Sequence, residues 1–192
     1  MNNNELNHSL ILNTIAELLT DICDESTKDK DNNTSKLYIH ITSIIGIIKP
    51  FLSKKVPAIT IKNYLERLIK YTKIESTTLV LILIFIDRVC DINKIRLNYF
   101  NIHKLIIASM LVSIKYNEDD YFSNEFYAKV GGIRMAEMNK LEYEFLSLIE
   151  FNLFVNEEVF NKYNTYLISA HDDEDDNEEE EEKEEVINTD KV

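Results

Sequence analysis

The feature that most constrains this chain is an uninterrupted apolar run, LVLILIFI, from Leu79 to Ile86. Asp87 and Arg88 follow it at once, so the run is far shorter than the roughly 20 residues that a membrane-spanning helix needs. A helix with this sequence is apolar on nearly every face and must be surrounded by neighbours. We therefore expect a central, buried helix over residues 76–91 and no membrane partner.

The rest of the pattern is also helical. Glycine and proline number only three and two among 192 residues, which argues against β-rich and turn-dense architectures. Thr60 suits the N-cap of one helix and a hydroxyl residue at 76–78 that of the next, while Gly131-Gly132 suits a helix end. Apolar residues at helical spacing predict an all-α fold, with helices at 61–72, 76–91, 101–116, 123–130, 135–150 and 156–170.

The first 55 residues are expected to be an accessory region. An amphipathic pattern predicts a helix over residues 5–22, and the polar segment near 24–36 is expected to be a linker or exposed loop. The apolar stretch 36–49 favours a helix that stops before Pro50, although its many β-branched residues leave a strand open.

The formal net charge of −13 is concentrated at the C-terminal end of the chain. Residues 171–192 hold 13 of the 34 acidic and 2 of the 21 basic residues, so that the remainder is nearly neutral. No basic face of the kind that nucleic acid requires is indicated, and we expect no nucleic-acid partner. The acidic run repels itself too strongly to collapse at neutral pH, so we expect a disordered acidic tail over residues 171–192.

The cysteines and the N-terminus bear on localisation. Cys23 and Cys90 lie far apart with no CxxC spacing, which indicates neither a disulfide framework nor a zinc site. The N-terminal segment lacks a positively charged start and carries Glu17 inside its apolar stretch, unlike a secretory signal or a transit peptide. We expect the protein in the nucleus, the cytoplasm or both.

The motifs of common enzymes are absent from the sequence. There is no GxGxxG, GxxxxGK[ST], GxSxG or HExxH, and His8, His40, His103 and His171 are not spaced to place two on one helical face. Asp119 and Asp120 are interpreted as a solvated turn. The sequence therefore predicts no catalytic residue, no metal and no cofactor.

Three consecutive segments carry a resemblance to a known family. They are VPAITIKNYLERLIKYTKIESTTLVLILIFIDRVC, LNYFNIHKLIIASMLVSIKYNEDDYFSNEFYAKVGGI and EMNKLEYEFLSLIEFNLFV, which begin at Val56 and end at Val155. The combination of YLERLIKY, FIDRV, NIHKL, FYAKVGGI and LEYEFL resembles the cyclin box, specifically that of the single-box Pho80-like class, also called P/U-type cyclins. The resemblance covers about half of the chain, in order and without a large gap.

The resemblance implies a fold and a function. It implies a five-helix cyclin box at 56–154, preceded by N-terminal accessory helices at 1–55 and followed by a short helix at 155–170. It also implies a regulatory subunit that forms a heterodimer with a cyclin-dependent serine/threonine protein kinase and activates it. The alternatives are a cyclin-fold adaptor that binds proteins without activating a kinase and, more remotely, an enzyme of unknown type.

The resemblance also assigns kinase-binding residues. The family's contact Lys and Glu map onto Lys115, in SIKYNED, and Glu142, in KLEYEFL. The residues themselves leave another interpretation open, in which Lys115 caps its own helix and Glu142 is solvated. Tyr121 and Phe122 are further candidates for the same interface, because aromatic residues are frequent anchors there, and Phe126 is a weaker one.

Two further residues are assigned a structural role by the resemblance. Arg67 and Asp87 occupy positions at which cyclins commonly place an ion pair between the first and second helices of the box. The chain departs from two-box cyclins, because only a short helix and the acidic tail follow Phe154, and no MRAIL-type substrate-docking motif precedes the box. Substrate docking through that motif is therefore not expected.

Overall fold

The computed structural model describes residues 3–28 and 48–170, and its regular elements there are all helices. All but the last two residues of the expected helix or strand at 36–49, most of the expected linker and the expected disordered tail at 171–192 lie outside the described residues. The elements are α1 (Asn3–Lys28), the 3₁₀ turn η2 (Lys49–Phe51), α3 (Ile61–Thr72), α4 (Ser76–Asn93), α5 (Ile102–Asn117), α6 (Asn124–Gly131), α7 (Met135–Leu148) and α8 (Glu157–Ser169).

The centre of the five-helix unit α3–α7 is α5. This helix contacts each of the other four, and every residue from Ile102 to Ile114 except Lys104 is buried. The prediction that the helix with the apolar run at Leu79–Ile86 is the central one is wrong in this respect. Both α4 and α5 are apolar on most faces, and hydrophobic pattern alone does not tell which of two such helices lies in the middle.

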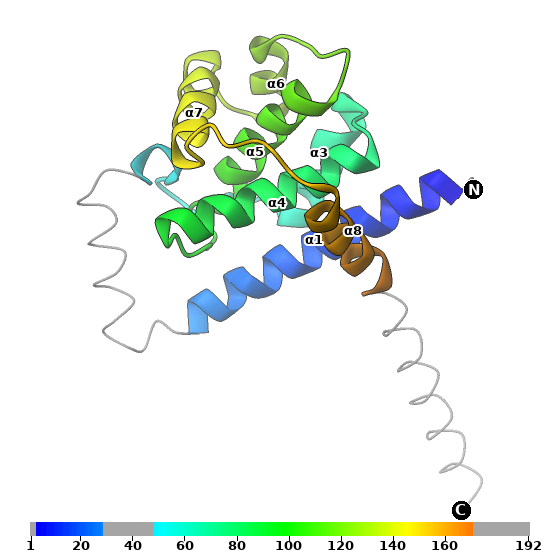
Figure 1. Ribbon diagram of the computed structural model, residues 1–192. Helices are drawn as coiled ribbons and strands as arrows, with labels where there is room; N and C mark the ends of the chain where they lie inside the picture. The colour runs from blue at the N-terminus through cyan, green and yellow to red at the C-terminus, as the bar shows by residue number, and fades with distance from the viewer. Residues whose placement is uncertain (1–2, 29–47, 171–192) are drawn as a thin grey trace, which may run out of the picture.

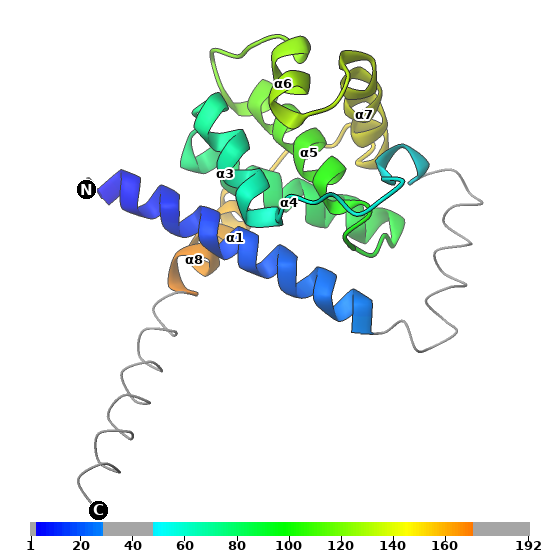
Figure 2. The ribbon, with the colours of Figure 1, turned by 180° about the vertical axis from the view of Figure 1, so that it is seen from behind.

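The apolar run of α4 is buried because helices from both ends of the described chain cover it. One side of α4 packs on α5, and Ser109 Oγ of α5 donates a hydrogen bond across this contact to the Ile82 carbonyl of α4 (2.8 Å). Its other side is covered by α1 and α8, as Figures 1 and 2 show from opposite directions. Thr14 of α1 donates a hydrogen bond to the Leu167 carbonyl of α8 (3.0 Å), which joins the two covering helices.

The helix α1 extends further than the sequence predicts. It continues to Lys28, through the first residues of the segment that we expected to be a linker. Tyr99, in the loop before α5, donates a hydrogen bond to Asp24 Oδ1 (2.7 Å), and Cys23 is fully buried. These tertiary contacts stabilise the C-terminal end of α1, although its polar sequence is typical of a loop.

Three predicted helix starts are confirmed by their capping bonds. Thr60 and Ser123 accept hydrogen bonds from the backbone N–H groups of Asn63 and Phe126, and Asn156 caps α8 in the same way. Gly132 ends α6 in the left-handed conformation, at φ 72°. These caps agree with the helix boundaries expected from the sequence to within one or two residues.

The start of α4 is capped by a residue from another part of the chain. Its N-cap position is Glu75, and neither Ser76 nor its neighbours make the local capping bond that we expected. Instead the carboxylate of Glu118, which follows α5, accepts hydrogen bonds from the Glu75 N–H (3.0 Å) and from the Thr78 hydroxyl. The end of α5 thereby fixes the beginning of α4.

Among residues 3–28 and 48–170, no helix combines the length and the apolar character that crossing a bilayer requires.

We expect Glu118→Ala to lower the free energy of unfolding by about 1–2 kcal/mol, because it leaves the start of α4 uncapped. Asp119→Ala, at the exposed neighbouring position, is the matched control and is expected to change it by less than about 0.5 kcal/mol. Urea denaturation measures both. Equal stability of the two variants would contradict the capping role of Glu118.

His103 makes the stability of the fold depend on pH. Burial lowers the pKa of His103 below its ordinary value of 6.5, and the nearby Arg67 guanidinium lowers it further, against the opposing effect of the hydrogen bond with the Ile59 carbonyl. The ring also packs against Tyr64 in a tilted arrangement, with 5.1 Å between the centroids and 59° between the planes. His103 is therefore held neutral in the folded protein at a pH where the unfolded chain binds a proton.

We accordingly expect the protein to lose stability as the pH falls from about 7 towards 5, because only the unfolded state gains the proton of His103. In His103→Gln this part of the pH dependence is removed, and the loss between the same two pH values becomes smaller. Thermal melting of both proteins across this range measures the difference. An unchanged pH profile in the variant would show that His103 does not contribute.

Candidate protein-docking site

Lys115 and Glu142, which are 27 residues apart in sequence, meet at one edge of the five-helix unit. Lys115 lies in the last turn of α5 and Glu142 in the middle of α7, and the Lys115 Nζ to Glu142 Oε1 distance is 2.6 Å. The packing of α7 against α5 brings them together. Lys115 therefore forms an ion pair with a residue of another helix, and Glu142 is more than the solvated charge of the alternative interpretation.

A third residue, which the sequence analysis missed, holds the second oxygen of Glu142. Asn124, the first residue of α6, donates a hydrogen bond from Nδ2 to Glu142 Oε2 (2.7 Å) and another to Asn139 Oδ1 (2.8 Å). The carboxylate of Glu142 thus connects the last three helices of the unit in one orientation. Asn124 stands directly after the capping residue Ser123, but nothing in the sequence reveals that its side chain reaches α7.

The pair is accessible at the surface. The side chains of Lys115 and Glu142 are 31% and 18% exposed, so that water or a partner protein can reach both. Because ion pairs of this exposure contribute about 0–1 kcal/mol to stability, folding does not depend on this one. Its charges are fixed in position and remain available to a partner.

Exposed aromatic side chains lie in the loop that leads to Asn124, the hydrogen-bond partner of Glu142. Tyr121 and Phe122, in the loop between α5 and α6, are 57% and 54% exposed. The loop is anchored, because the Phe122 N–H donates a hydrogen bond to the Tyr127 hydroxyl (3.0 Å) and the Phe122 ring packs against Phe126 at a centroid distance of 4.3 Å. Phe126 is half-buried and packs against the core, in keeping with its weaker candidacy.

Two tyrosines that were not among the predicted contact residues are also exposed, and each follows one member of the pair in the sequence. Tyr116 follows Lys115 and Tyr143 follows Glu142, with 46% and 65% of their surfaces exposed. Tyr116 also packs edge-on against Phe85 of α4, at a centroid distance of 6.1 Å. The exposure of Tyr143 could have been predicted from the sequence, because Tyr143 is not part of the apolar face of α7. That face is formed by Met138, Leu141, Phe145 and Leu148.

The structure does not bring Arg67 and Asp87 together, and the predicted ion pair between them is wrong. Arg67 lies over the ring of Tyr64, 5.0 Å from its centroid, near the start of the α6–α7 connection at Gly132. Asp87 accepts a hydrogen bond from the Tyr163 hydroxyl of α8. The carboxylate faces the covering helix α8, outside the five-helix unit, and the guanidinium faces α6.

No group of three His, Cys, Asp or Glu residues able to hold a metal ion occurs in the described part of the chain. Burial raises the pKa of the Cys23 and Cys90 thiols to about 12, with smaller effects of neighbouring carboxylates. Both thiols are therefore protonated near neutral pH and are weak nucleophiles.

The described residues form an all-helical unit with a fixed, accessible ion pair at one edge. The comparisons with known proteins identify its family. A family model described as Cyclin matches residues 7–153, so that the matched range includes α1 as well as α3–α7. The chain belongs to the cyclin family.

The curated relatives identify the class within that family. Cyclin-U2-1 of Arabidopsis thaliana is 34% identical over 82% of this chain and 68% of its own length. PHO85 cyclin-like protein psl1 of Schizosaccharomyces pombe is 33% identical, over 74% of this chain and 60% of the relative. PHO85 cyclin-7 of Saccharomyces cerevisiae is 32% identical, over 86% of this chain and 60% of the relative. The protein is a Pho80-like cyclin.

We expect Lys115→Ala and Glu142→Ala each to lower the free energy of unfolding by no more than about 1 kcal/mol, as for other solvent-accessible pairs. Phe145→Ala, one turn from Glu142 but fully buried, is expected to cost about 3–5 kcal/mol. Urea denaturation of the three variants tests this. A large loss of stability in either charge variant would mean that the pair is architectural.

Proposed function

We propose that this cyclin binds and activates a cyclin-dependent serine/threonine protein kinase, and that Lys115 and Glu142 form the centre of the kinase-binding surface. Tyr121 and Phe122 are the aromatic anchors at its edge. The observation that carries the proposal is the Lys115–Glu142–Asn124 arrangement, in which one accessible carboxylate is held by two helices other than its own.

The geometry of the pair supports a contact role. A Lys ammonium carries three donors and a carboxylate has several acceptor positions, so both groups can bond to a partner's backbone or side chains while they remain paired. Because Asn124 already fixes the orientation of Glu142, little further side-chain entropy is lost when a partner binds. Exposed aromatic rings beside such charges are typical of interface hot spots.

The packing of α5 supports an activating role. A kinase is active when the Glu of its αC helix pairs with the Lys of strand β3, and a rigid surface pressed on that helix can hold it in this position. The helix that carries Lys115 is buried along nearly its whole length and cannot shift independently. Binding energy spent on this surface shifts the kinase towards its active conformation.

The names of two relatives also support a regulatory role. PHO85 cyclin-7 and PHO85 cyclin-like protein psl1 are described as cyclins of PHO85 or as similar to them. By analogy, this chain acts as the non-catalytic partner in a heterodimer. The second candidate is a cyclin-fold adaptor that binds a protein without stimulating phosphorylation, which the same exposed edge also suits.

The test is affinity capture of the tagged full chain from its own cells, followed by mass spectrometry and a kinase assay on the eluate. In Lys115→Glu and Glu142→Lys we expect recovery of the co-purifying kinase to fall by on the order of tenfold or more, because each variant places two like charges together. Lys140→Glu, exposed on the same helix α7, is the matched control and is expected to retain the kinase.

Circular dichroism and melting temperature show whether each variant is folded. Retention of the kinase by both pair variants would refute the site assignment. A stable complex that does not increase the rate of phosphorylation would refute activation and favour the adaptor.

A further inference from the structure

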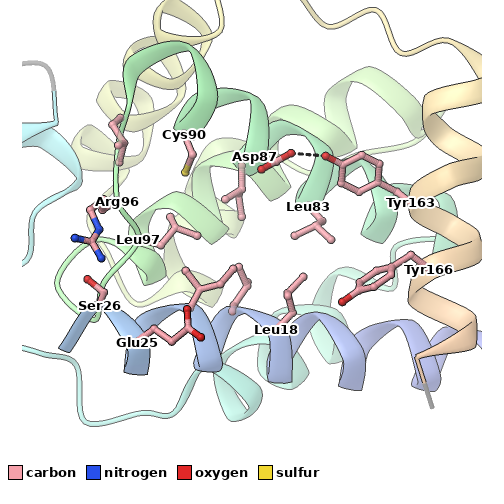
Figure 3. A pocket seen from close by; sticks show the side chains of 14 residues that line it. Leu18, Glu25, Ser26, Leu83, Asp87, Cys90, Arg96, Leu97, Tyr163 and Tyr166 are labelled. Atoms are coloured by element: carbon pink, nitrogen blue, oxygen red, sulfur yellow. Dashed lines mark hydrogen bonds between the residues drawn. The ribbon is translucent and has the colours of Figure 1, made fainter. Parts of the chain in front are cut away.

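A groove between the covering helices and α4 has no role in the kinase-binding surface. It has a volume of about 460 Å³, within the range of ligand pockets, and opens between α1, α4, α8 and the segment after α4. Figure 3 shows Leu18 of α1 and Leu83 of α4 pointing towards each other across it. Its lining also includes Leu19, Ile22, Ile86, Ile95 and Leu97, so that an apolar occupant suits it.

The charged side chains of the lining do not favour a strongly charged occupant. Asp87 already accepts a hydrogen bond from the Tyr163 hydroxyl, drawn as a dashed line in Figure 3. Arg96 has an interaction of its own, and it lines the same end of the groove as Glu25, so that both signs of charge lie there. The groove therefore selects its occupant through the burial of apolar surface.

The sequence contains an uncharged apolar stretch outside the described residues. Residues 37–45 read LYIHITSII, with six apolar residues among nine and no Asp, Glu, Lys or Arg. The polar residues 29–36, DKDNNTSK, separate this stretch from the end of α1. Removing the apolar side chains from water is favourable, so the stretch and the groove suit each other chemically.

The connection that carries this stretch begins and ends near the same end of the groove. Its first residue follows the end of α1, and Ser26 in the last turn of α1 lines the groove. The described chain resumes at Ile48, and soon after it the Ser53 N–H donates a hydrogen bond to the Phe100 carbonyl (2.8 Å). Phe100 stands four residues after Arg96, which lies beside Ser26 at one end of the groove in Figure 3.

The connection is long enough for the stretch to enter the groove. Leu18 and Ser26 both line it and are eight residues apart on α1, so the groove extends about 12 Å. Nine residues lead from Lys28 to residue 37, and as extended chain they reach about 30 Å. Seven residues lead from residue 41 to Ile48, and they reach about 24 Å. A length of 12 Å takes about four residues of extended chain or eight of helix, and the stretch supplies either.

From these observations we propose that residues 37–45 of the same chain occupy the groove between α1, α4 and α8. Their apolar side chains fill the space between Leu18 and Leu83. Because the stretch is tethered at both ends, its effective concentration at the groove is on the order of millimolar, and it competes with separate molecules for the same surface. The inference does not rest on the proposed kinase contact, which lies on α5, α6 and α7.

Photocrosslinking in the purified full chain, without a kinase, tests the occupant. The photoreactive residue p-benzoylphenylalanine replaces Tyr166, which is 52% exposed and lies at the end of the groove opposite Arg96. We expect irradiation to give an intrachain adduct with residues 37–45, mapped by mass spectrometry, in a yield that does not change with protein concentration. The same replacement at Tyr71, which is 54% exposed on α3 outside the groove lining, is the matched control and is expected to give no such adduct.

Other crosslinks identify other occupants. Adducts at position 166 with a different segment of the chain, with a second copy of the chain or with a co-purifying lipid, in place of residues 37–45, would overturn the proposal. The absence of any adduct would overturn it as well.

Charged substitutions within the stretch provide a second test. In the double variant Ile39→Asp and Ile41→Asp we expect the yield of the adduct to fall by on the order of tenfold, because two carboxylates would have to be buried against apolar side chains. Binding of the neutral apolar dye Nile red is expected to rise as the groove empties. The control Asn32→Asp and Asn33→Asp makes the same change in net charge in the polar part of the connection and is expected to behave as the wild type.

Circular dichroism shows whether both double variants are folded. Equal adduct yields in the two double variants would overturn the proposal, and so would equal binding of the dye.

Discussion

The burial of the apolar run on α4 is the constraint on which the rest of the structure depends. Thr78–Ile86 is buried without interruption, and no single neighbouring helix can cover all of its faces. One side is covered by α5, the hub of the five-helix unit, and the other by α1 and α8 from the two ends of the described chain. The covering helices are thus part of one hydrophobic core with the five-helix unit, and the family match that begins at residue 7 agrees with this.

The position of the Lys115–Glu142 pair follows from the same core. Lys115 is exposed only because α5 reaches the surface at its last turn, directly after the buried residue Ile114. Glu142 stands beside Leu141, which packs inwards, so the charge is held at the edge of the apolar face of α7. Two buried helices therefore determine where the charges lie, and Asn124 determines how the carboxylate is oriented. The weak contribution of an accessible pair to stability fits a contact role better than a structural one.

The parts of the fold that the sequence predicted are those set by local chemistry. Thr60 and Ser123 each cap a helix within their own turn, and Gly132 ends one, so nearby residues are enough to locate these boundaries. The missed features depend on residues distant in sequence. Glu118 caps α4 from more than 40 residues away, and Asp24 bonds to Tyr99 at the end of α1. Lys115 and Glu142 were found through the family resemblance, whereas the partner of Asp87 is Tyr163, outside the unit that the resemblance covers.

The layered arrangement also separates two surfaces that differ in chemistry. The edge formed by α5, α6 and α7 presents a fixed ion pair, whereas the groove between α1, α4 and α8 is lined mainly by apolar side chains, with Glu25, Asp87 and Arg96 among them. Because α4 and α5 pack directly against each other, the two surfaces are held in a fixed relation.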